Sequence, residues 1–140
     1  MATTSVSTPI PTGVSVQHIL QALHNHELMI RTLCPSLITY SLESGNPAST
    51  ATYSVTDKKP VGQTTYKLTL TNTPYGIKSL VQAKPSTGTL TIAGNWCISN
   101  GTLREDVEIE GNFMMKKMAK GNVERTHPQQ HSLLLQQATA

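Results

Sequence analysis

The chain has 140 residues, 37% of them hydrophobic, which is the size of one domain with a buried core. Its net charge is +3, but only 14% of the residues are charged and the basic ones are scattered, which argues against nucleic-acid binding. No stretch approaches the ~20 apolar residues that span a bilayer, and the N-terminus does not resemble a secretory signal. We therefore expect one cytoplasmic domain over residues 1–140 without membrane insertion, frayed at about 1–4 and 136–140.

The N-terminal part predicts a short extended segment and then a helical region. Residues 7–15, STPIPTGVS, contain two prolines and a glycine that end the extended segment. Ser15 is a good N-cap for the run VQHILQALHNHELMIRTL, residues 16–33. Apolar residues recur there at intervals of three and four, which predicts either one kinked helix or two short ones. The pair Cys34–Pro35 ends the region.

Strand patterns follow, separated by turn residues. The six segments are LITYSLE, ATYSVTDK, TTYKLTLTN, IKSLVQAK, TLTIAGNWCIS and TLREDVEIE. The Asn100–Gly101 pair between the last two is the strongest hairpin signal in the chain. Six strands joined by short turns predict an antiparallel sheet, with a helical region before it and a long helix after it. A twisted sheet of this size curls around a terminal helix and encloses a cavity.

This order of elements resembles the helix-grip superfamily, which includes START domains, the birch-pollen allergen and the polyketide cyclase/dehydrase-like (SRPBCC) proteins. It is similar in particular to small fungal members of that group. The resemblance rests on TPIPTGVS running into ILQALHNHELMIRTLCPSL, on the single-Trp strand LTIAGNWCI, and on TLREDVEIEGN running into the final helix. The chain is short, and no insertion resembles a dedicated lid.

The resemblance implies an α+β fold in which a curved antiparallel sheet of about six to seven strands wraps around a long C-terminal helix. It also implies a deep, mostly apolar pocket for lipids, hormones, polyketides or terpenoids. Some members of the superfamily only carry such ligands, whereas others cyclise or isomerise them without a cofactor. Fold alone does not decide between these functions.

The last strand, residues 102–110, predicts a buried acid. One face carries only charged residues, which are Arg104, Asp106, Glu108 and Glu110. The other face carries Leu103, Glu105, Val107 and Ile109. Because the charged face must be wet, Glu105 is expected to point inward, where burial raises the pKa of a carboxyl. Glu105 is then either a general acid or base, or a structural group that hydrogen-bonds Trp96 or a helix.

The final helix is expected to form the other wall of a cavity of a few hundred cubic ångströms, over residues 113–127. Its predicted inward residues are Met115, Met118, Asn122 and Thr126, which recur at helical spacing. Methionine adapts to ligands of varied shape but also fills ordinary cores, so both roles stay open. Gly121 weakens this helix and Pro128 breaks or kinks it, which favours a helix that bends to admit a ligand.

Aromatic residues supply the polar groups that we expect to orient a ligand. Tyr53 and Tyr66 lie on the apolar faces of neighbouring strands, and Trp96 shares a face with Leu90, Ile92 and Ile98. Tyr40 joins them if its strand turns that face inward. The predicted ligand-binding residues are Tyr40, Tyr53, Tyr66, Trp96, Leu103, Val107, Met115, Met118 and Asn122. The alternative for the aromatic residues is that they are ordinary half-buried strand positions.

No pattern predicts a metal or a cofactor. His24 and His26 are two residues apart and fall on different sides of a helix, while Pro128 interrupts the pair His127 and His131. Cys34 and Cys97 are expected to be free thiols. The sequence also lacks a GxSxG motif, a CxxC pair and a Gly-rich phosphate loop.

The sequence therefore predicts a protein that binds a hydrophobic small molecule. We favour a cofactor-independent cyclase or isomerase acting on a polyketide- or terpenoid-like intermediate of a fungal secondary-metabolite pathway, with proton transfer by Glu105. The alternative is a non-catalytic protein that binds or transfers a lipid or metabolite, and a third class is a scaffold with a collapsed pocket. The expected state is a monomer or a weak homodimer.

Overall fold

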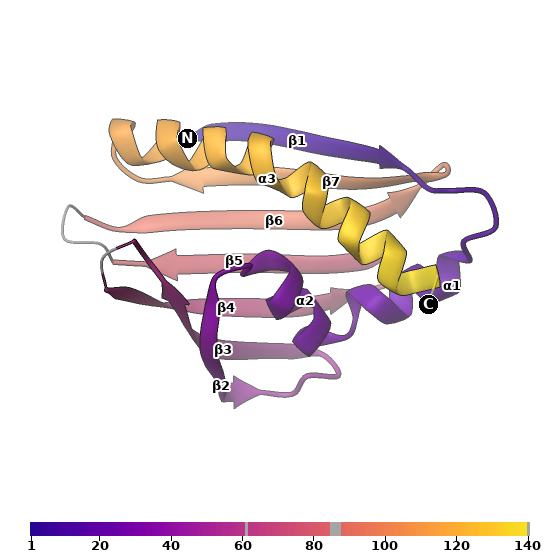
Figure 1. Cartoon of the computed structure of the whole chain (residues 1–140), viewed down its shortest axis with the longest axis horizontal. Coiled ribbons are helices and arrows are strands. Elements are labelled where there is room, and N and C mark those ends of the chain that lie inside the picture. The colour runs from indigo at the N-terminus through magenta and orange to yellow at the C-terminus, as the bar shows by residue number, and fades with distance from the viewer. Residues whose placement is uncertain (61, 85–87, 140) are drawn as a thin grey trace.

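Figure 1 shows the computed structural model, which describes residues 1–60, 62–84 and 88–139. Seven strands form one antiparallel sheet in the order β1-β7-β6-β5-β4-β3-β2. The strands are β1 (Ala2–Pro9), β2 (Leu37–Gly45), β3 (Thr50–Lys58), β4 (Gln63–Thr73), β5 (Gly76–Ala83), β6 (Leu90–Ser99) and β7 (Thr102–Glu110). The helices are α1 (Val16–Leu23), α2 (His26–Leu33) and α3 (Phe113–Thr139), all on one side of the sheet. The predicted helix-grip arrangement is confirmed.

The helical region before the sheet consists of two short helices. Ser15 caps α1, because its Oγ accepts hydrogen bonds from the backbone N–H groups of Gln17 and His18, at 3.1 and 3.3 Å. Asn25 then caps α2, because its Oδ1 accepts from the N–H of Leu28 at 3.1 Å. A second N-cap within the run therefore restarts the helix in a new direction.

Both ends of the described chain belong to regular elements, which corrects the expectation of frayed ends. β1 pairs with β7 along its whole length, from Ala2 to Pro9. At the other end α3 continues to Thr139, and Ala138 is only 6% exposed. Residue 140 lies outside the described residues. Strand pairing and helix packing thus hold segments that composition alone predicts to be loose.

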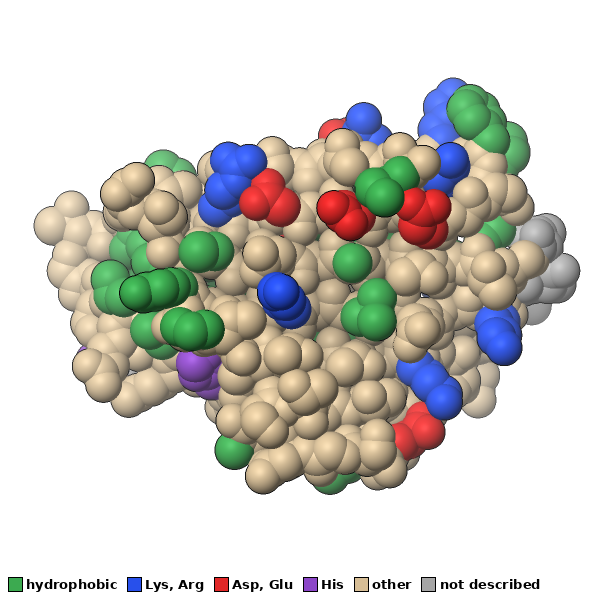
Figure 2. Space-filling model, turned by 180° about the vertical axis from the view of Figure 1, so that it is seen from behind, with side chains coloured by type: hydrophobic (Ala, Val, Ile, Leu, Met, Phe, Trp, Pro, Cys, Tyr) green, Lys and Arg blue, Asp and Glu red, His purple; other side chains and the backbone are tan. Residues whose placement is uncertain are grey.

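The inner face of the sheet builds the core and the outer face is polar. On β7 the inward residues Leu103, Glu105, Val107 and Ile109 are at most 1% exposed, and the charged residues between them are exposed. This is the alternation that the sequence predicts. Figure 2 views the outer face, most of which is covered by polar side chains and backbone. Full burial of each inward apolar side chain stabilises the fold by about 1.5–3 kcal/mol.

The long helix α3 has 27 residues but is largely polar. Neither α3 nor any other helix within the described residues is long and apolar enough to cross a membrane. Pro128 lies inside α3, at the position where a break or a kink is predicted from the sequence. The helix continues past this residue and bends near its middle (Figure 1). Proline has no N–H for the carbonyl of residue 124, so the bend has a local cause.

We expect Pro128→Ala to raise the free energy of unfolding by about 1–3 kcal/mol, because alanine restores the missing helical hydrogen bond and removes the ring clash. Chemical denaturation would measure the change. The neighbouring exposed residue offers a control, since Gln129→Ala should change stability by less than ~0.5 kcal/mol. A loss of stability in Pro128→Ala would mean that the bend itself is needed for α3 to pack.

Candidate functional site

A buried carboxylate on β7 is held by two histidines from α3. Nδ1 of His127 lies 2.8 Å from Oε2 and 2.9 Å from Oε1 of Glu105. Nε2 of His131 lies 3.1 Å from Oε1. The side chains of Glu105 and His131 are 1% and 0% exposed, and that of His127 is 13% exposed. We refer to these three residues as the Glu105 cluster, which joins the final helix to the last strand.

The two histidines meet one carboxylate because they are four residues apart on a continuous helix. Residues at this spacing lie one above the other on the same helical face. The prediction that Pro128 interrupts this pair is wrong, because α3 continues through that residue. A usable signal was present: an inward acid on the last strand, followed by a histidine pair at i and i+4 on the next helix.

The hydrogen atoms of the cluster follow from its chemistry. An ionised carboxylate only accepts hydrogen bonds, so Nδ1 of His127 and Nε2 of His131 both donate. The second nitrogen of His131 accepts from the Thr8 hydroxyl on β1, at 2.9 Å. The second nitrogen of His127, Nε2, has no hydrogen-bond partner within the described residues. Both ring nitrogens of His131 therefore form hydrogen bonds, whereas Nε2 of His127 remains available to accept one.

The expected rise in the pKa of Glu105 is not found. Burial alone raises the pKa of this carboxyl, but the hydrogen bonds from His127 and His131 outweigh burial. The net result is a pKa below the ordinary value. The predicted rise in pKa takes account only of the apolar neighbours of Glu105 on its own strand. An anionic Glu105 orients and stabilises the histidines and is poorly suited to donate a proton itself.

The indole of Trp96 on β6 contributes an unused donor beside the cluster. It packs against the ring of His131, with ring centres 4.5 Å apart, and its Nε1 is buried without a partner among the described residues. A Cβ at Gly94 would lie 2.7 Å from Ser79 Oγ, 3.3 Å from Glu105 Oε2 and 3.8 Å from the indole nitrogen. A side chain at position 94 would therefore force Ser79 to shift, so glycine suits the place where β6 passes the cluster. A buried donor without an acceptor, such as the indole N–H, costs about 1–3 kcal/mol.

The other paired histidines, His24 and His26, have structural partners. Nε2 of His24 lies 2.9 Å from two backbone carbonyls at the β4–β5 turn, to which it donates. Nε2 of His26 donates to Asn72 Oδ1, and its Nδ1 accepts from the Tyr53 hydroxyl, both at 2.9 Å. Burial lowers the pKa of His26. Within the described residues no group of three or more acids, histidines or cysteines is placed to hold a metal ion.

The predicted tyrosines lie on the inner face, but their hydroxyls are engaged inside the protein. Tyr53 is 4% exposed, its hydroxyl is bound to α2, and Tyr40 packs edge-on against its ring. The Tyr66 hydroxyl donates to Asp57 Oδ2 at 2.9 Å and lies 3.0 Å from Cys34 Sγ. Burial raises the pKa of Cys34 to about 11, so at neutral pH its thiol is protonated and donates to Tyr66. The ligand-binding roles of these tyrosines remain predictions.

The remaining predicted positions divide between the inner face and solvent. Leu103 and Val107 are buried beside Glu105, and Met115 is half-buried. Met118 is 71% exposed and Asn122 is also exposed, so both point away from the sheet and correct the predicted helix face. The histidines set the rotation of α3, and the residues that turn toward the sheet are Met115, Ala119, Val123, His127 and His131.

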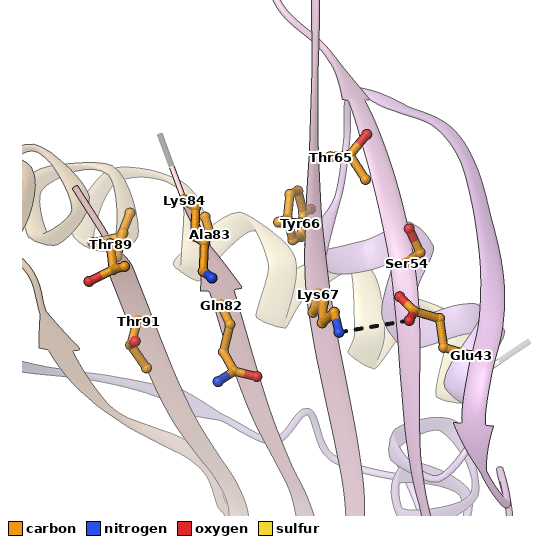
Figure 3. Close-up of a pocket in the computed structure, with 11 residues that line it drawn as sticks. Glu43, Ser54, Thr65, Tyr66, Lys67, Gln82, Ala83, Lys84, Thr89 and Thr91 are labelled. Carbon is orange, nitrogen blue, oxygen red and sulfur yellow. Dashed lines mark ion pairs between the residues drawn. The ribbon is translucent and has the colours of Figure 1, made fainter. Parts of the chain in front are cut away.

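Two hollows within the described residues both lie away from the predicted cavity. One hollow has a volume of about 640 Å³. It lies near Lys67 and Gln82, which form the last pair between β4 and β5, where β4 extends beyond β5. Figure 3 shows the Lys67–Glu43 ion pair (3.9 Å) at one side of this hollow. The second, of about 710 Å³, lies over the exposed side of α1. Neither is between the sheet and residues 113–127, since the histidines and the indole fill the space beside Glu105.

Comparison with known protein families identifies the chain. The sequence matches the family described as "Domain of unknown function (DUF7053)" over residues 1–140. The chain belongs to this family. A comparison with curated proteins gave no match.

Solved structures share the architecture of this DUF7053 protein. Ara h 8.0201 aligns with a TM-score of 0.65 at 9% identity, covering 96% of this chain and 98% of that one. The Zhui aromatase/cyclase from Streptomyces sp. R1128 aligns with a TM-score of 0.61 at 11% identity, covering 99% of this chain and 92% of that one. A STAR-related lipid transfer protein from Xanthomonas axonopodis aligns with a TM-score of 0.58 at 10% identity, covering 94% of this chain and 84% of that one. At such identities these likenesses establish the helix-grip fold.

We predict that Glu105→Gln lowers the free energy of unfolding by about 3 kcal/mol near neutral pH, because a buried charge-assisted network loses its anion. The folded-state pKa of Glu105 is depressed, so its contribution is present above the ordinary value of 4.5 and is lost as the pH falls through the folded pKa. The stability difference between wild type and Glu105→Gln should therefore shrink below about pH 4.5.

Denaturation midpoints measured across this acidic range test the prediction, and Glu108→Gln is the matched control. Glu108 lies on the same strand but is exposed, so its replacement should leave stability nearly unchanged. A difference between wild type and Glu105→Gln that stays constant down to strongly acidic pH would contradict the depressed pKa.

Proposed function

We propose that this protein binds a hydrophobic carbonyl compound between the sheet and α3, in space that opens when the part of α3 before Pro128 shifts outward, and that it moves a proton on this compound through His127. The observation that carries the proposal is the state of the His127 ring, whose Nδ1–H is held by Glu105 while Nε2 has no partner among the described residues. A carboxylate on one ring nitrogen and a free acceptor on the other is the arrangement of a histidine general base. The ring is 13% exposed, so a ligand has access to it.

In the proposed reaction, Nε2 of His127 takes a proton from the carbon next to the ligand carbonyl and leaves an enolate. The imidazolium that forms lies 2.8 Å from the Glu105 carboxylate, which stabilises its positive charge. The unpartnered indole N–H of Trp96 donates to the enolate oxygen. Return of the proton to a different carbon gives an isomer. Attack of the enolate carbon on a second carbonyl closes a ring, and the His127 imidazolium then gives its proton to the new alkoxide. Neither path consumes a cofactor.

The substrate we propose is a polyketide- or terpenoid-like intermediate of a fungal secondary-metabolite pathway, and the protein is then a cofactor-free isomerase or cyclase. Three features support this class. The ligand would lie against the apolar inner face beside Leu103 and Val107. The free donor and the free base are those that enolisation needs. The fold is also that of the Zhui aromatase/cyclase.

A second candidate is a non-catalytic protein that binds or transfers a hydrophobic molecule. The hydrogen bonds from Thr8 to His131 and from His131 to Glu105 link β1, α3 and β7, which is what a purely structural cluster would do. The likeness in fold to a STAR-related lipid transfer protein is consistent with this function. In this case Glu105 and both histidines only hold the helix against the sheet.

Deuterium uptake by 2-tetralone in D2O, followed by NMR, distinguishes the candidates, because this bicyclic ketone enolises readily. We expect wild type to accelerate exchange beside the carbonyl. His127→Gln should reduce the protein-catalysed rate about 10²–10⁴-fold with little change in ketone affinity, since general base catalysis contributes that much. His18→Gln on α1, an exposed histidine outside the cluster, is the matched control and should behave as wild type.

Each other outcome has a definite meaning. Binding of 2-tetralone and of its hydrocarbon analogue tetralin without any accelerated exchange would support the non-catalytic candidate. Exchange that survives His127→Gln would exclude His127 as the base. Failure to bind either compound would contradict a hydrophobic ligand site beside His127.

A further inference from the structure

The beginning of α3 exposes an unusual group of apolar side chains. Phe113, Met114 and Met118 are 75%, 67% and 71% exposed, and Phe113 is the single phenylalanine of the chain. We call these three residues the α3 tip. Met114 and Met118 are four residues apart and therefore share a face of the helix. Large apolar side chains gathered at the surface indicate a binding surface rather than part of the core.

Lysines gather at the same end of the sheet as the α3 tip. Because the strands are antiparallel, the β3–β4 turn, the β5–β6 turn and the beginning of α3 lie at the same end of the sheet (Figure 1). The basic residues in these segments are Lys58, Lys59, Lys84, Lys116, Lys117 and Lys120, against the acids Asp57 and Glu110. None of these six lysines forms an ion pair within the described residues. Figure 2 shows lysine and hydrophobic side chains side by side where α3 begins.

The opposite end of the sheet has a different character. Its turns, residues 10–15, 46–49, 74–75 and 100–101, contain no charged residue. The positive charge of this otherwise weakly charged chain is therefore concentrated at one end, together with the exposed apolar side chains.

The position of these lysines works against the stability of the helix. The N-terminal end of a helix carries a partial positive charge, so cations in the first turns are unfavourable by about 0.3–1 kcal/mol each. Lys116 and Lys117 lie there, and α3 has no acid in its first turn to offset them. Helix formation does not explain this arrangement, whereas attraction to an external anionic surface does.

We infer that this end of the molecule docks on an anionic lipid bilayer. The α3 tip inserts into the headgroup region while the lysines lie over anionic lipids, which is the pattern of a peripheral membrane-binding helix. If the proposed function holds, docking brings the α3 side of the ligand site to the bilayer from which a hydrophobic ligand would come. The docking itself does not depend on that function.

Co-sedimentation with phosphatidylcholine vesicles, with and without phosphatidylserine, tests the inference. We expect binding only to the vesicles with phosphatidylserine, and weaker binding as salt increases. Replacing Lys116, Lys117 and Lys120 with glutamine should weaken partitioning about 100-fold, at roughly fivefold per lysine. The double variant Phe113→Ser/Met118→Ser should weaken it by about tenfold or more, through lost apolar burial.

Two control variants remove the same kinds of side chain from other parts of the surface. Arg31→Gln/Lys67→Gln/Lys78→Gln removes the same charge from α2 and the outer face of the sheet and should leave vesicle binding nearly intact. Tyr75→Ser removes a side chain that is 67% exposed at the uncharged end and should have no effect on binding. Thermal unfolding of each variant establishes that it is folded.

Equal losses of vesicle binding in the control and test triple variants would overturn the inference. Binding would then depend on the net charge of the protein and not on the position of the lysines. Binding to neutral vesicles as strong as to anionic ones would also overturn it. So would a wild-type dimer that the Phe113→Ser/Met118→Ser variant separates, since the α3 tip would then contact a second copy. Absence of vesicle binding with normal 2-tetralone exchange would reject the docking and leave the proposed function standing.

Discussion

The placement of α3 depends on one carboxylate that water cannot reach. Glu105 is 1% exposed, and an anion at that depth is tolerated only if its oxygens accept strong hydrogen bonds. Donors from two successive turns of one helix meet this need, at 2.8–3.1 Å. Two attachment points four residues apart set both the height of the helix over β7 and its rotation about its own axis.

That rotation explains features far from the carboxylate. With His127 and His131 turned inward, the residues at intervals of four before them, such as Val123, must also face the sheet. Met114 and Met118 then have no place in the core and lie in solvent. The same constraint that completes the candidate site thus produces the exposed apolar group at the beginning of the helix. The second nitrogen of His131 accepts from Thr8 while that of His127 has no partner within the described residues, and this difference separates a structural role from a reactive one.

The fold could be predicted from the sequence to a large extent, because its signals are local. Ser15 as a cap, Asn100–Gly101 as a hairpin and the alternation on β7 each involve neighbouring residues, and each is confirmed. The site was predicted only in part. Glu105 faces inward as expected, but the direction of its pKa shift depends on groups 22 and 26 residues away along the chain. The inward face of α3 was missed because polar histidines occupy it while methionines do not.

The contact between Trp96 and His131 has an optical consequence. The chain has a single tryptophan, so all of its indole fluorescence comes from one ring, which lies 4.5 Å from a ring on α3. The indole is fully buried, and separation of the helix from the sheet would expose it to water and shift its emission to longer wavelength. The emission maximum of the unmodified protein therefore reports whether α3 is packed on the sheet, without any added dye or label.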